Sequence, residues 1–212
     1  MAPSTSTLAI LAAAALSHAN PWGPPPWHGP HRPQESCGYQ GGEPTVTASA
    51  GVIIGTTTAI PSATATVNQY LGVPFAKSPP VRFSPPQPPA PYSSPLVAQK
   101  WSPACIQQFQ YPRASYEFTR EVFNNPPPKE SEDCLYLNVY APSTPAPSDG
   151  RAVMYWIYGG ALQFGNAGQP AYDGSWFAAN EDVIVVTVNY RTNGMVSYMG
   201  LNTSVERELT LQ

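Results

Sequence analysis

Residues 153–188 read VMYWIYGGALQFGNAGQPAYDGSWFAANEDVIVVTV and contain two nearly continuous apolar runs, at 153–157 and 183–188. Such runs are typical of strands covered on both faces, as in a parallel sheet with helices on each side. Between them, Asp173 is a good N-cap and Asn180 a tolerable C-cap for a short helix. This order of strand, loop, helix and strand predicts a β-α-β crossover and an α/β fold class. A buried hairpin is the alternative, although the stretch between the two runs is long for one.

The segments upstream predict shorter strands separated by loops. Residues 52–57 and 64–71 are rich in Val, Ile and Thr, and they predict short antiparallel strands. Residues 135–140 alternate apolar and polar side chains, which predicts a half-buried strand. The many prolines of residues 79–95 predict extended or turning loop, and residues 142–150 predict a further loop.

The overall composition excludes some classes of partner. Charged residues make up only 11% of the 212 residues and the net charge is -3, so we expect no attraction to nucleic acid or to an anionic membrane. The chain holds 27 prolines, which predict many turns and few long helices.

The first 19 residues predict a secretory signal peptide. Residues 8–16 form an apolar run that is too short to span a bilayer, and the small residues Ser17 and Ala19 suit cleavage. A buried N-terminal helix is the alternative. Because no later stretch is long and apolar enough to span a membrane, we expect a secreted, extracellular protein without a membrane span.

Residues 20–45 are rich in Pro, Gly, His and Trp and predict a flexible leader. His28 and His31 lie three residues apart there, so a metal site is conceivable. Two histidines without a scaffold are usually solvated linker residues, and we predict no metal site. We expect no cofactor either.

Export would allow two covalent modifications, disulfide bonding and glycosylation. The three cysteines are Cys37, Cys105 and Cys134; an oxidising compartment permits disulfides, and the odd count leaves one thiol without an intrachain partner. Asn202 begins an N-x-[ST] sequence in a polar stretch, which predicts a glycosylation site.

A glycine pair follows the first apolar run, in the sequence Tyr158-Gly159-Gly160-Ala161. Glycines at the end of a strand let the backbone turn sharply and point its N–H groups into a cleft. Such N–H groups can stabilise a developing oxyanion. Taken alone, two glycines after a strand are more often a simple turn.

Four segments, in the same order, resemble the type-B carboxylesterase/lipase family, which includes the cholinesterases. They are YLGVPFA at 70–76 with Val81-Arg82-Phe83, SEDCLYLN at 131–138, WIYGGA at 156–161 and VTVNYR at 186–191. The resemblance covers roughly residues 46–212, and chance recurrence of all four segments in order is very improbable.

The resemblance implies the N-terminal part of an α/β-hydrolase fold, with antiparallel leading strands before the first strands of a central, mostly parallel sheet. It further implies a secreted, fungal-type carboxylic-ester hydrolase that acts on a small ester through a serine acyl-enzyme. A non-catalytic binding protein of the same fold is the alternative, because fold does not fix function.

The resemblance also assigns roles to individual residues. Gly160 and Ala161 would donate the N–H groups of an oxyanion hole and Gly159 would open the turn. Ala161 stands where a third glycine is usual, and its methyl group would narrow the acyl side of the pocket. Cys105 and Cys134 would form the family's first disulfide, and Arg82 and Glu132 a structural ion pair. Cys37 would then be free or pair with another molecule.

The nucleophile and the general base of the family are missing from the sequence. It holds no G-x-S-x-G motif, and every histidine lies at or before His31. Ser175 is interpreted as a helix-capping and surface residue in the first turn of a helix. Glu132 and Asp133 are rejected as a catalytic pair because neighbouring strand residues face opposite ways. We therefore expect a fragment that ends before the nucleophile and is inactive alone.

The sequence says little about which ester is bound. In cholinesterases a Trp within the first disulfide loop holds the substrate's quaternary ammonium. No Trp lies between Cys105 and Cys134, and Phe123 is the nearest candidate. This absence disfavours choline esters and favours a neutral aliphatic or aryl ester.

Overall fold

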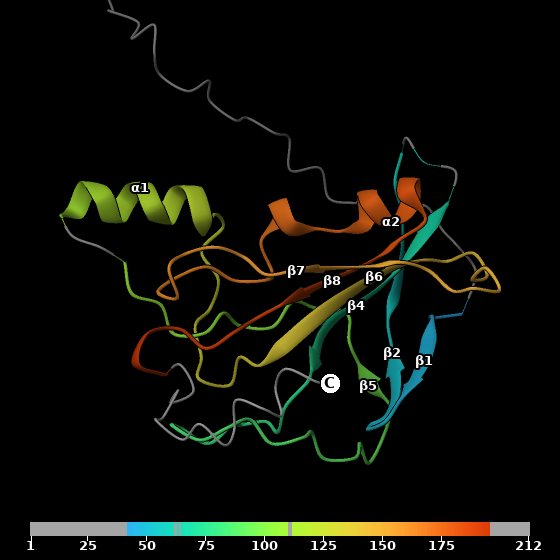
Figure 1. The fold of residues 1–212 in the computed structure, drawn as a ribbon, viewed down its shortest axis with the longest axis horizontal. Helices are drawn as coiled ribbons and strands as arrows, with labels where there is room; N and C mark the ends of the chain where they lie inside the picture. Colours follow the sequence, from blue (N-terminus) through green and yellow to red (C-terminus); the bar gives the residue numbers. More distant parts are fainter. Residues whose placement is uncertain (1–41, 62, 64, 110–111, 196–212) are drawn as a thin grey trace, which may run out of the picture. The chain divides into compact units, whose positions relative to one another are not determined.

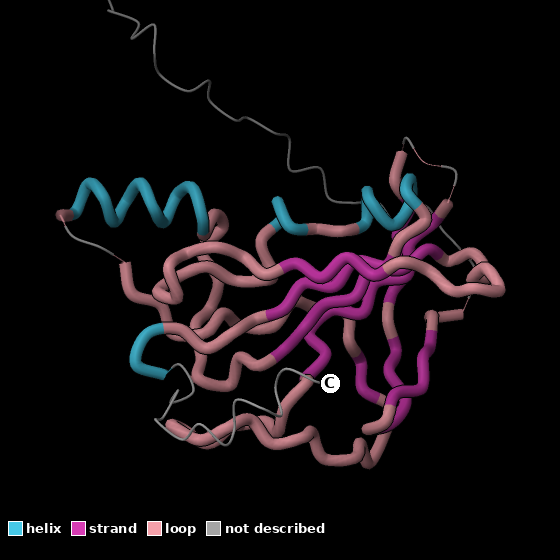
Figure 2. Tube along the Cα trace, in the orientation of Figure 1, coloured by secondary structure: helices cyan, strands magenta, loops and turns pink. Residues whose placement is uncertain are grey.

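The computed structural model describes residues 42–195, except for residues 62, 64, 110 and 111. The predicted signal peptide, most of the predicted leader, Cys37 and Asn202 lie outside this part. Figure 1 colours the chain along its sequence, and Figure 2 distinguishes its helices, strands and loops. The elements are β1 (Thr45–Ala48), β2 (Gly51–Ile54), β3 (Thr56–Ala59), β4 (Thr66–Pro74), β5 (Leu96–Val97), α1 (Arg113–Phe123), β6 (Tyr136–Pro142), β7 (Val153–Trp156), η1 (Pro170–Tyr172), α2 (Ser175–Glu181), β8 (Ile184–Val188) and η2 (Asn193–Met195).

The strands form two sheets. The smaller sheet has the order β1-β2-β5, and the larger has the order β3-β4-β6-β8-β7. The predicted antiparallel leading strands are confirmed, because β1 with β2 and β3 with β4 pair antiparallel. The predicted strand at 52–57 is divided between β2 and β3, which belong to different sheets.

The β-α-β crossover predicted for residues 153–188 is confirmed, and with it the α/β class. Strand β7 pairs parallel to β8, from Val153 opposite Ile184 to Trp156 opposite Thr187. Helix α2 lies between them in the sequence and packs over β4, β6 and β8 on one face of the sheet (Figure 1). The hairpin alternative is excluded by this parallel pairing.

The predicted caps of this helix are shifted. Gly174, not Asp173, is the N-cap, and Asp173 instead accepts a hydrogen bond from the Ser175 N–H at 2.8 Å. Asn180 lies inside the helix, and the C-cap is Asp182 with a φ of 52°. Asp173 thus still accepts a hydrogen bond from one N–H of the first turn, although it lies one residue before the N-cap.

The main core lies between α2 and the larger sheet. It contains Val67, Tyr140, Ala178 and Val185, with Leu71 at its edge. The two apolar runs differ in burial. Strand β8 has three buried residues, whereas all four residues of β7 are exposed, and among the described strands β7 pairs with β8 alone.

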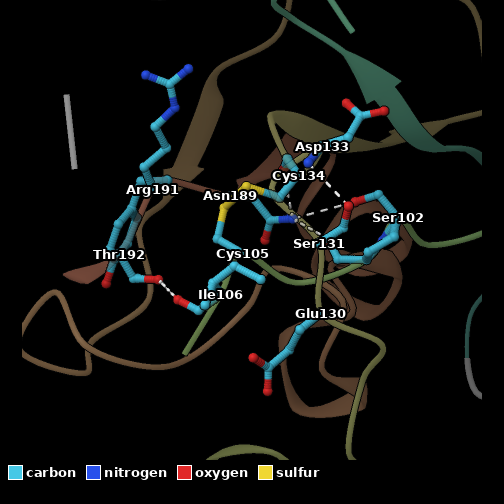
Figure 3. Close-up of a disulfide and its surroundings, with 12 residues drawn as sticks. Ser102, Cys105, Ile106, Glu130, Ser131, Asp133, Cys134, Asn189, Arg191 and Thr192 are labelled. Carbon is cyan, nitrogen blue, oxygen red and sulfur yellow. Dashed lines mark hydrogen bonds between the residues drawn. A yellow bond between two sulfur atoms is a disulfide. The ribbon is translucent and has the colours of Figure 1, made fainter. Parts of the chain in front are cut away.

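A disulfide between Cys105 and Cys134 closes a loop that contains helix α1 (Figure 3). Both cysteines are at most 2% exposed and pack with Ala76 and Leu135. No residue of α1 is buried, although the loop's two ends lie in the core. The bridge therefore fastens a surface segment to the interior.

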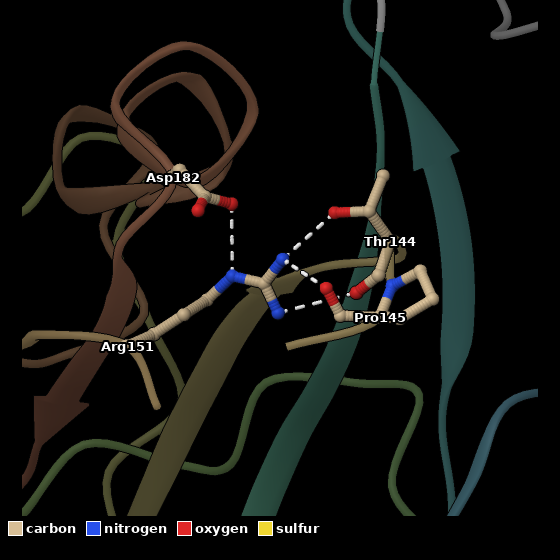
Figure 4. A network of polar contacts seen from close by, with 4 residues as sticks. All are labelled: Thr144, Pro145, Arg151 and Asp182. Carbon is tan, nitrogen blue, oxygen red and sulfur yellow. Dashed lines mark hydrogen bonds and ion pairs between the residues drawn. The ribbon is translucent and has the colours of Figure 1, made fainter. Parts of the chain in front are cut away.

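Arg151, two residues before β7, is a polar anchor of the fold (Figure 4). Its side chain is only 6% exposed. The guanidinium donates to Asp182 at 2.8 Å, to the Thr144 hydroxyl at 2.8 Å, and to the carbonyls of Thr144 and Pro145 at 3.1 and 3.0 Å. Arg151 thus joins the loop after β6 to the residue that ends α2.

We predict that replacing both cysteines, in a Cys105→Ala/Cys134→Ala variant, lowers the free energy of unfolding by about 3–4 kcal/mol, because the unfolded chain gains loop freedom. Denaturant unfolding monitored by circular dichroism measures the change. A reductant should shift the unfolding midpoint of the wild type and leave that of the double variant in place. An unshifted wild type would contradict the prediction.

Arg151→Ala should lower the free energy of unfolding by about 2 kcal/mol, because several nearly buried charge-assisted hydrogen bonds are lost. The control is Arg113→Ala. Arg113 pairs with Glu117 at 2.7 Å, but its side chain is 88% exposed, so its loss should change stability by under about 0.5 kcal/mol. Equal losses in the two variants, measured by denaturant unfolding, would refute the proposed importance of the Arg151 contacts.

Candidate active site

The candidate site lies where β7 and β8 end. Because the two strands are parallel, the segments that follow them, 157–162 and 189–191, emerge at the same edge of the sheet. Ligands of open α/β sheets bind at this carboxyl edge. The glycine turn after the first apolar run and the NYR sequence after the second are thereby brought together.

The turn itself has an unusual backbone. Gly160 has a φ of 136°, and the next two residues, Ala161 and Leu162, have φ values of 53° and 59°. The Gly160 carbonyl accepts hydrogen bonds from the N–H groups of Gln163 at 2.9 Å and Phe164 at 3.3 Å. A β-carbon on Gly160 would lie 2.0 Å from the Phe164 carbonyl oxygen. Only glycine fits this position.

The N–H groups of the turn remain available to a ligand. Within the described residues, the N–H groups of Gly159, Gly160 and Ala161 donate no hydrogen bond. All three residues line the same cavity. Successive free N–H groups in a turn of this kind form a concave site that favours an anion.

The cavity has a volume of about 680 Å³ and is lined chiefly by apolar and aromatic side chains. Those of Phe75, Leu135, Ile157 and Val188 contribute to its wall. Leu162 lines it as well and is 56% exposed. Ala161 lies at this wall, so its methyl group occupies space that a third glycine would leave free. An apolar cavity beside a few polar N–H groups is the usual form of a small-molecule site.

Two stacked tyrosines contact the start of the turn. The rings of Tyr158 and Tyr190 lie 4.4 Å apart at an angle of 19°. The Tyr190 hydroxyl donates to the Tyr158 carbonyl at 2.8 Å. Burial raises the pKa of both phenols above the ordinary value of 10, so both hydroxyls stay protonated at neutral pH.

Arg191 and Asn189 fix the second segment of the site. Arg191 is 8% exposed and donates to the carbonyls of Ser84 at 2.7 Å and Val81 at 2.9 Å. The Asn189 side chain donates to the carbonyls of Pro103 and Cys134, both at 3.0 Å. These roles were not predicted, although both residues belong to the quoted VTVNYR segment. A polar Asn or Arg directly after an apolar strand indicates such a role, because a buried polar side chain needs hydrogen-bond partners.

Arg82 and Glu132 are joined by two hydrogen bonds, as the resemblance implied, but the pair is not buried. The Arg82 side chain is 63% exposed and that of Glu132 is 35% exposed. The hydrogen bonds from Arg82 lower the pKa of the Glu132 carboxyl. Any stability from the pair is thus present above the ordinary pKa of a glutamate and lost as the pH falls through the lowered value, and solvent screens it.

The predicted strand alternation of Glu132 and Asp133 is wrong. Neither residue is in a strand, because both precede β6 in a loop. They nevertheless have separate partners, since Asp133 accepts a hydrogen bond from the Ser78 hydroxyl at 2.7 Å. Neither residue lines the cavity beside the glycine turn.

Ser175 occupies the first turn of α2, as predicted, but the prediction that it is a surface residue is wrong. It is 3% exposed, and its hydroxyl accepts a hydrogen bond from the Gln69 side chain at 2.7 Å. It does not line the cavity. Its position in the core between α2 and β4 leaves it no access to a substrate at the glycine turn.

The described residues present N–H donors beside a chiefly apolar cavity. They include no histidine, and no group of three metal-ligating side chains is found among them. In the same part of the chain, no helix has the length and apolar character needed to cross a membrane. The arrangement can donate hydrogen bonds to a carbonyl or an anionic oxygen.

Comparison with known proteins gives a consistent result. The carboxylesterase family matches residues 42–206. Acetylcholinesterase of Electrophorus electricus is 38% identical over 167 residues, which are 77% of this chain and 25% of the relative. The medium-chain fatty acyl-CoA hydrolase precursor of Anas platyrhynchos is 38% identical over 169 residues, 77% of this chain and 29% of the relative.

The para-nitrobenzyl esterase of Bacillus subtilis is 44% identical over 128 residues, 59% of this chain and 24% of the relative. The chain thus spans 24–29% of the length of these relatives. The family match covers well over half of the chain, and it includes the glycine turn, the disulfide and both strands of the crossover. The chain belongs to the carboxylesterase family and has the α/β-hydrolase fold of that family.

Proposed function

We propose that this chain is the oxyanion-binding part of a secreted carboxylic-ester hydrolase that works through a serine acyl-enzyme. The observation that carries the proposal is the pair of N–H groups at Gly160 and Ala161, which have no acceptor among the described residues and line a chiefly apolar cavity. Such donors stabilise the negative oxygen of a tetrahedral intermediate.

The serine, histidine and acid of the reaction belong, in this proposal, to a longer polypeptide. The family membership and the share of each relative that the chain covers support this view. Serine would attack the ester carbonyl while histidine takes its proton, and the N–H groups of the glycine turn would hold the resulting oxyanion. The chain alone would then bind but not turn over an ester.

The proposed substrate is a neutral aliphatic or aryl ester. The cavity wall is chiefly apolar, although Asn189 and Arg191 also line it, and none of the described acidic side chains does. Phe123, the aromatic residue of the disulfide loop considered for cation binding, packs against Phe164 with ring centroids 5.6 Å apart. The Ala161 methyl group at the cavity favours a small acyl group.

A non-catalytic binding protein of the same fold is the second candidate. It would use the same cavity, and only the presence of a nucleophile separates the two functions. The secretory route, which the proposal includes, is supported by the disulfide between Cys105 and Cys134, because such bridges persist in oxidising compartments.

The decisive experiment reads the coding sequence beyond Gln212 and expresses both forms. We predict that the 212-residue chain does not hydrolyse p-nitrophenyl acetate, since it lacks a nucleophile and a base. The longer form should hydrolyse it and should be inhibited by a serine-directed organophosphate. A continuation without G-x-S-x-G and histidine favours the binding protein. Inhibitor-sensitive hydrolysis by the short chain would refute the assignment of the nucleophile to the longer form.

Gly160→Ala in the longer form should lower the rate about a hundredfold or more, because a displaced turn misplaces its N–H groups. In the 212-residue chain the same change should lower the free energy of unfolding by about 2 kcal/mol or more, because the new β-carbon would clash with the Phe164 carbonyl. The matched control is Gly159→Ala, whose β-carbon would meet nothing within 4 Å. Its stability loss should stay under about 1 kcal/mol. Equal losses of stability in Gly160→Ala and Gly159→Ala would contradict the predicted clash at Gly160.

A further inference from the structure

The proposed oxyanion donors, the N–H groups of Gly160 and Ala161, belong to peptides that can be fixed only through their carbonyls. The N–H groups must stay free for a substrate, so no protein group can hold them directly. A peptide is planar and trans, and its N–H therefore points opposite to its C=O. Whatever holds the carbonyls of Gly159 and Gly160 thus sets the direction of the two donors.

Both carbonyls contact the segment that follows the turn. The Gly160 carbonyl accepts hydrogen bonds from the N–H groups of Gln163 at 2.9 Å and Phe164 at 3.3 Å. The Gly159 carbonyl lies against Gly165, where an added β-carbon would be 2.9 Å from its oxygen. The directions of the donors thus depend on how this segment is held.

The first residues of the disulfide loop hold this segment at its two ends. The Gln107 side-chain oxygen accepts a hydrogen bond from the Gly165 N–H at 2.6 Å. The Gln108 N–H donates to the Gln163 carbonyl at 2.9 Å. Phe164 lies between these two contacts, and its N–H is the one that reaches back to the glycine turn.

The ring of Phe164 connects the disulfide loop to the turn. It contacts two rings of that loop, those of Phe109 with centroids 5.7 Å apart and Phe123 with centroids 5.6 Å apart. It also borders Gly160, because a β-carbon added there would lie 3.1 Å from the Phe164 Cδ2 atom. The disulfide loop therefore reaches the glycine turn through one aromatic side chain.

The hydrogen bond from Phe164 needs this support. Its length of 3.3 Å exceeds the usual N–H···O range of about 2.7–3.2 Å, so a small displacement of Phe164 would break it. Paired aromatic rings prefer certain separations and angles. Contacts between rings therefore restrain the residue more narrowly than a flexible aliphatic side chain in the same place would.

We propose that Phe164 is a positioning residue for the oxyanion donors, because its ring contacts with Phe109 and Phe123 keep its N–H against the Gly160 carbonyl. The Ala161 N–H shares a peptide with that carbonyl and is thereby kept in one direction. The role in catalysis rests on the proposed function, while the geometric part stands on the contacts alone. Phe164 does not line the cavity and touches no substrate in this proposal.

Tyr116 provides a matched control within the same group of rings. Its ring packs edge-on against Phe109 with centroids 5.2 Å apart. Tyr116→Leu removes this ring and leaves both ring contacts of Phe164 in place, whereas Phe164→Leu removes both. Phe123→Leu removes only one of them, and because Phe123 is 38% exposed the fold should tolerate the change.

The first test measures the direction of the Ala161 N–H bond in the 212-residue chain by NMR. Residual dipolar couplings are recorded with ¹⁵N labelling, and the alignment is determined from amides of β4, β6 and β8. The Ala161 coupling should fit the structure in the wild type and in Tyr116→Leu. It should change in Phe164→Leu and, by a smaller amount, in Phe123→Leu.

Three results of this measurement would overturn the proposal. They are an averaged coupling in the wild type, an unchanged coupling in Phe164→Leu, and equal changes in Phe164→Leu and Tyr116→Leu. If Phe164→Leu does not fold, Phe123→Leu decides in its place, and an unchanged Ala161 coupling there would overturn the proposal.

The second test measures the kinetics of the longer esterase on p-nitrophenyl acetate. Phe164→Leu should lower kcat about tenfold or more with KM within about twofold, because a misdirected donor weakens transition-state stabilisation more than ground-state binding. In Tyr116→Leu both constants should stay within about twofold of the wild type. An unchanged kcat in Phe164→Leu, or an equal fall in Tyr116→Leu, would overturn the catalytic part of the proposal. A longer form that is inactive even as the wild type would refute the proposed function instead, and the dipolar couplings would still decide whether Phe164 orients the peptide.

Discussion

The buried side-chain amide of Asn189 is the contact on which the arrangement of the site depends. Its oxygen accepts the Ala167 N–H at 2.8 Å, and its nitrogen donates to the carbonyls of Pro103 and Cys134. One residue past β8, this amide joins the end of the sheet to three separate loops, including the disulfide-bonded one. An apolar residue here would leave buried backbone groups without partners, at a penalty of about 1–3 kcal/mol for each. The position of Tyr190, and through it the glycine turn, follows from this anchor.

The site is built on the outermost described strand of the larger sheet. Strand β7 pairs on one side with β8, and its residues from Val153 to Trp156 are exposed. Stability at this strand comes from its ladder with β8, from Arg151 at its start and from the tyrosine pair beyond its end. The faces of β7 are less covered by apolar side chains than those of β4 and β6. Polar contacts therefore have to hold the N–H groups of the glycine turn in place at this edge.

The sequence predicted the α/β class and the glycine turn. It did not predict the polar contacts that fix the segments around that turn. Apolar runs and cap residues were enough for the crossover between β7 and β8, and the family motifs located Gly159 to Ala161. Periodicity reports how apolar a segment is and not which neighbours cover it, so the exposure of β7 follows from its place at the edge of the described sheet and not from its own sequence. Ser175 was misplaced for a similar reason, because a serine in a first helical turn is usually solvated and its bond to Gln69 spans 106 positions. The role of Asn189 depends on loops that meet only in three dimensions.

The disulfide has a consequence for the integrity of the chain under proteolysis. Helix α1 lies between Cys105 and Cys134, none of its residues is buried, and Phe118 is 67% exposed. A protease would find its most accessible helical peptide bonds here, since local opening needs little loss of packing. A cut within α1 leaves both pieces covalently joined through the sulfur atoms. The nicked chain would migrate as an intact one until a reductant separated it, and its glycine turn would still be attached to the sheet that supports it.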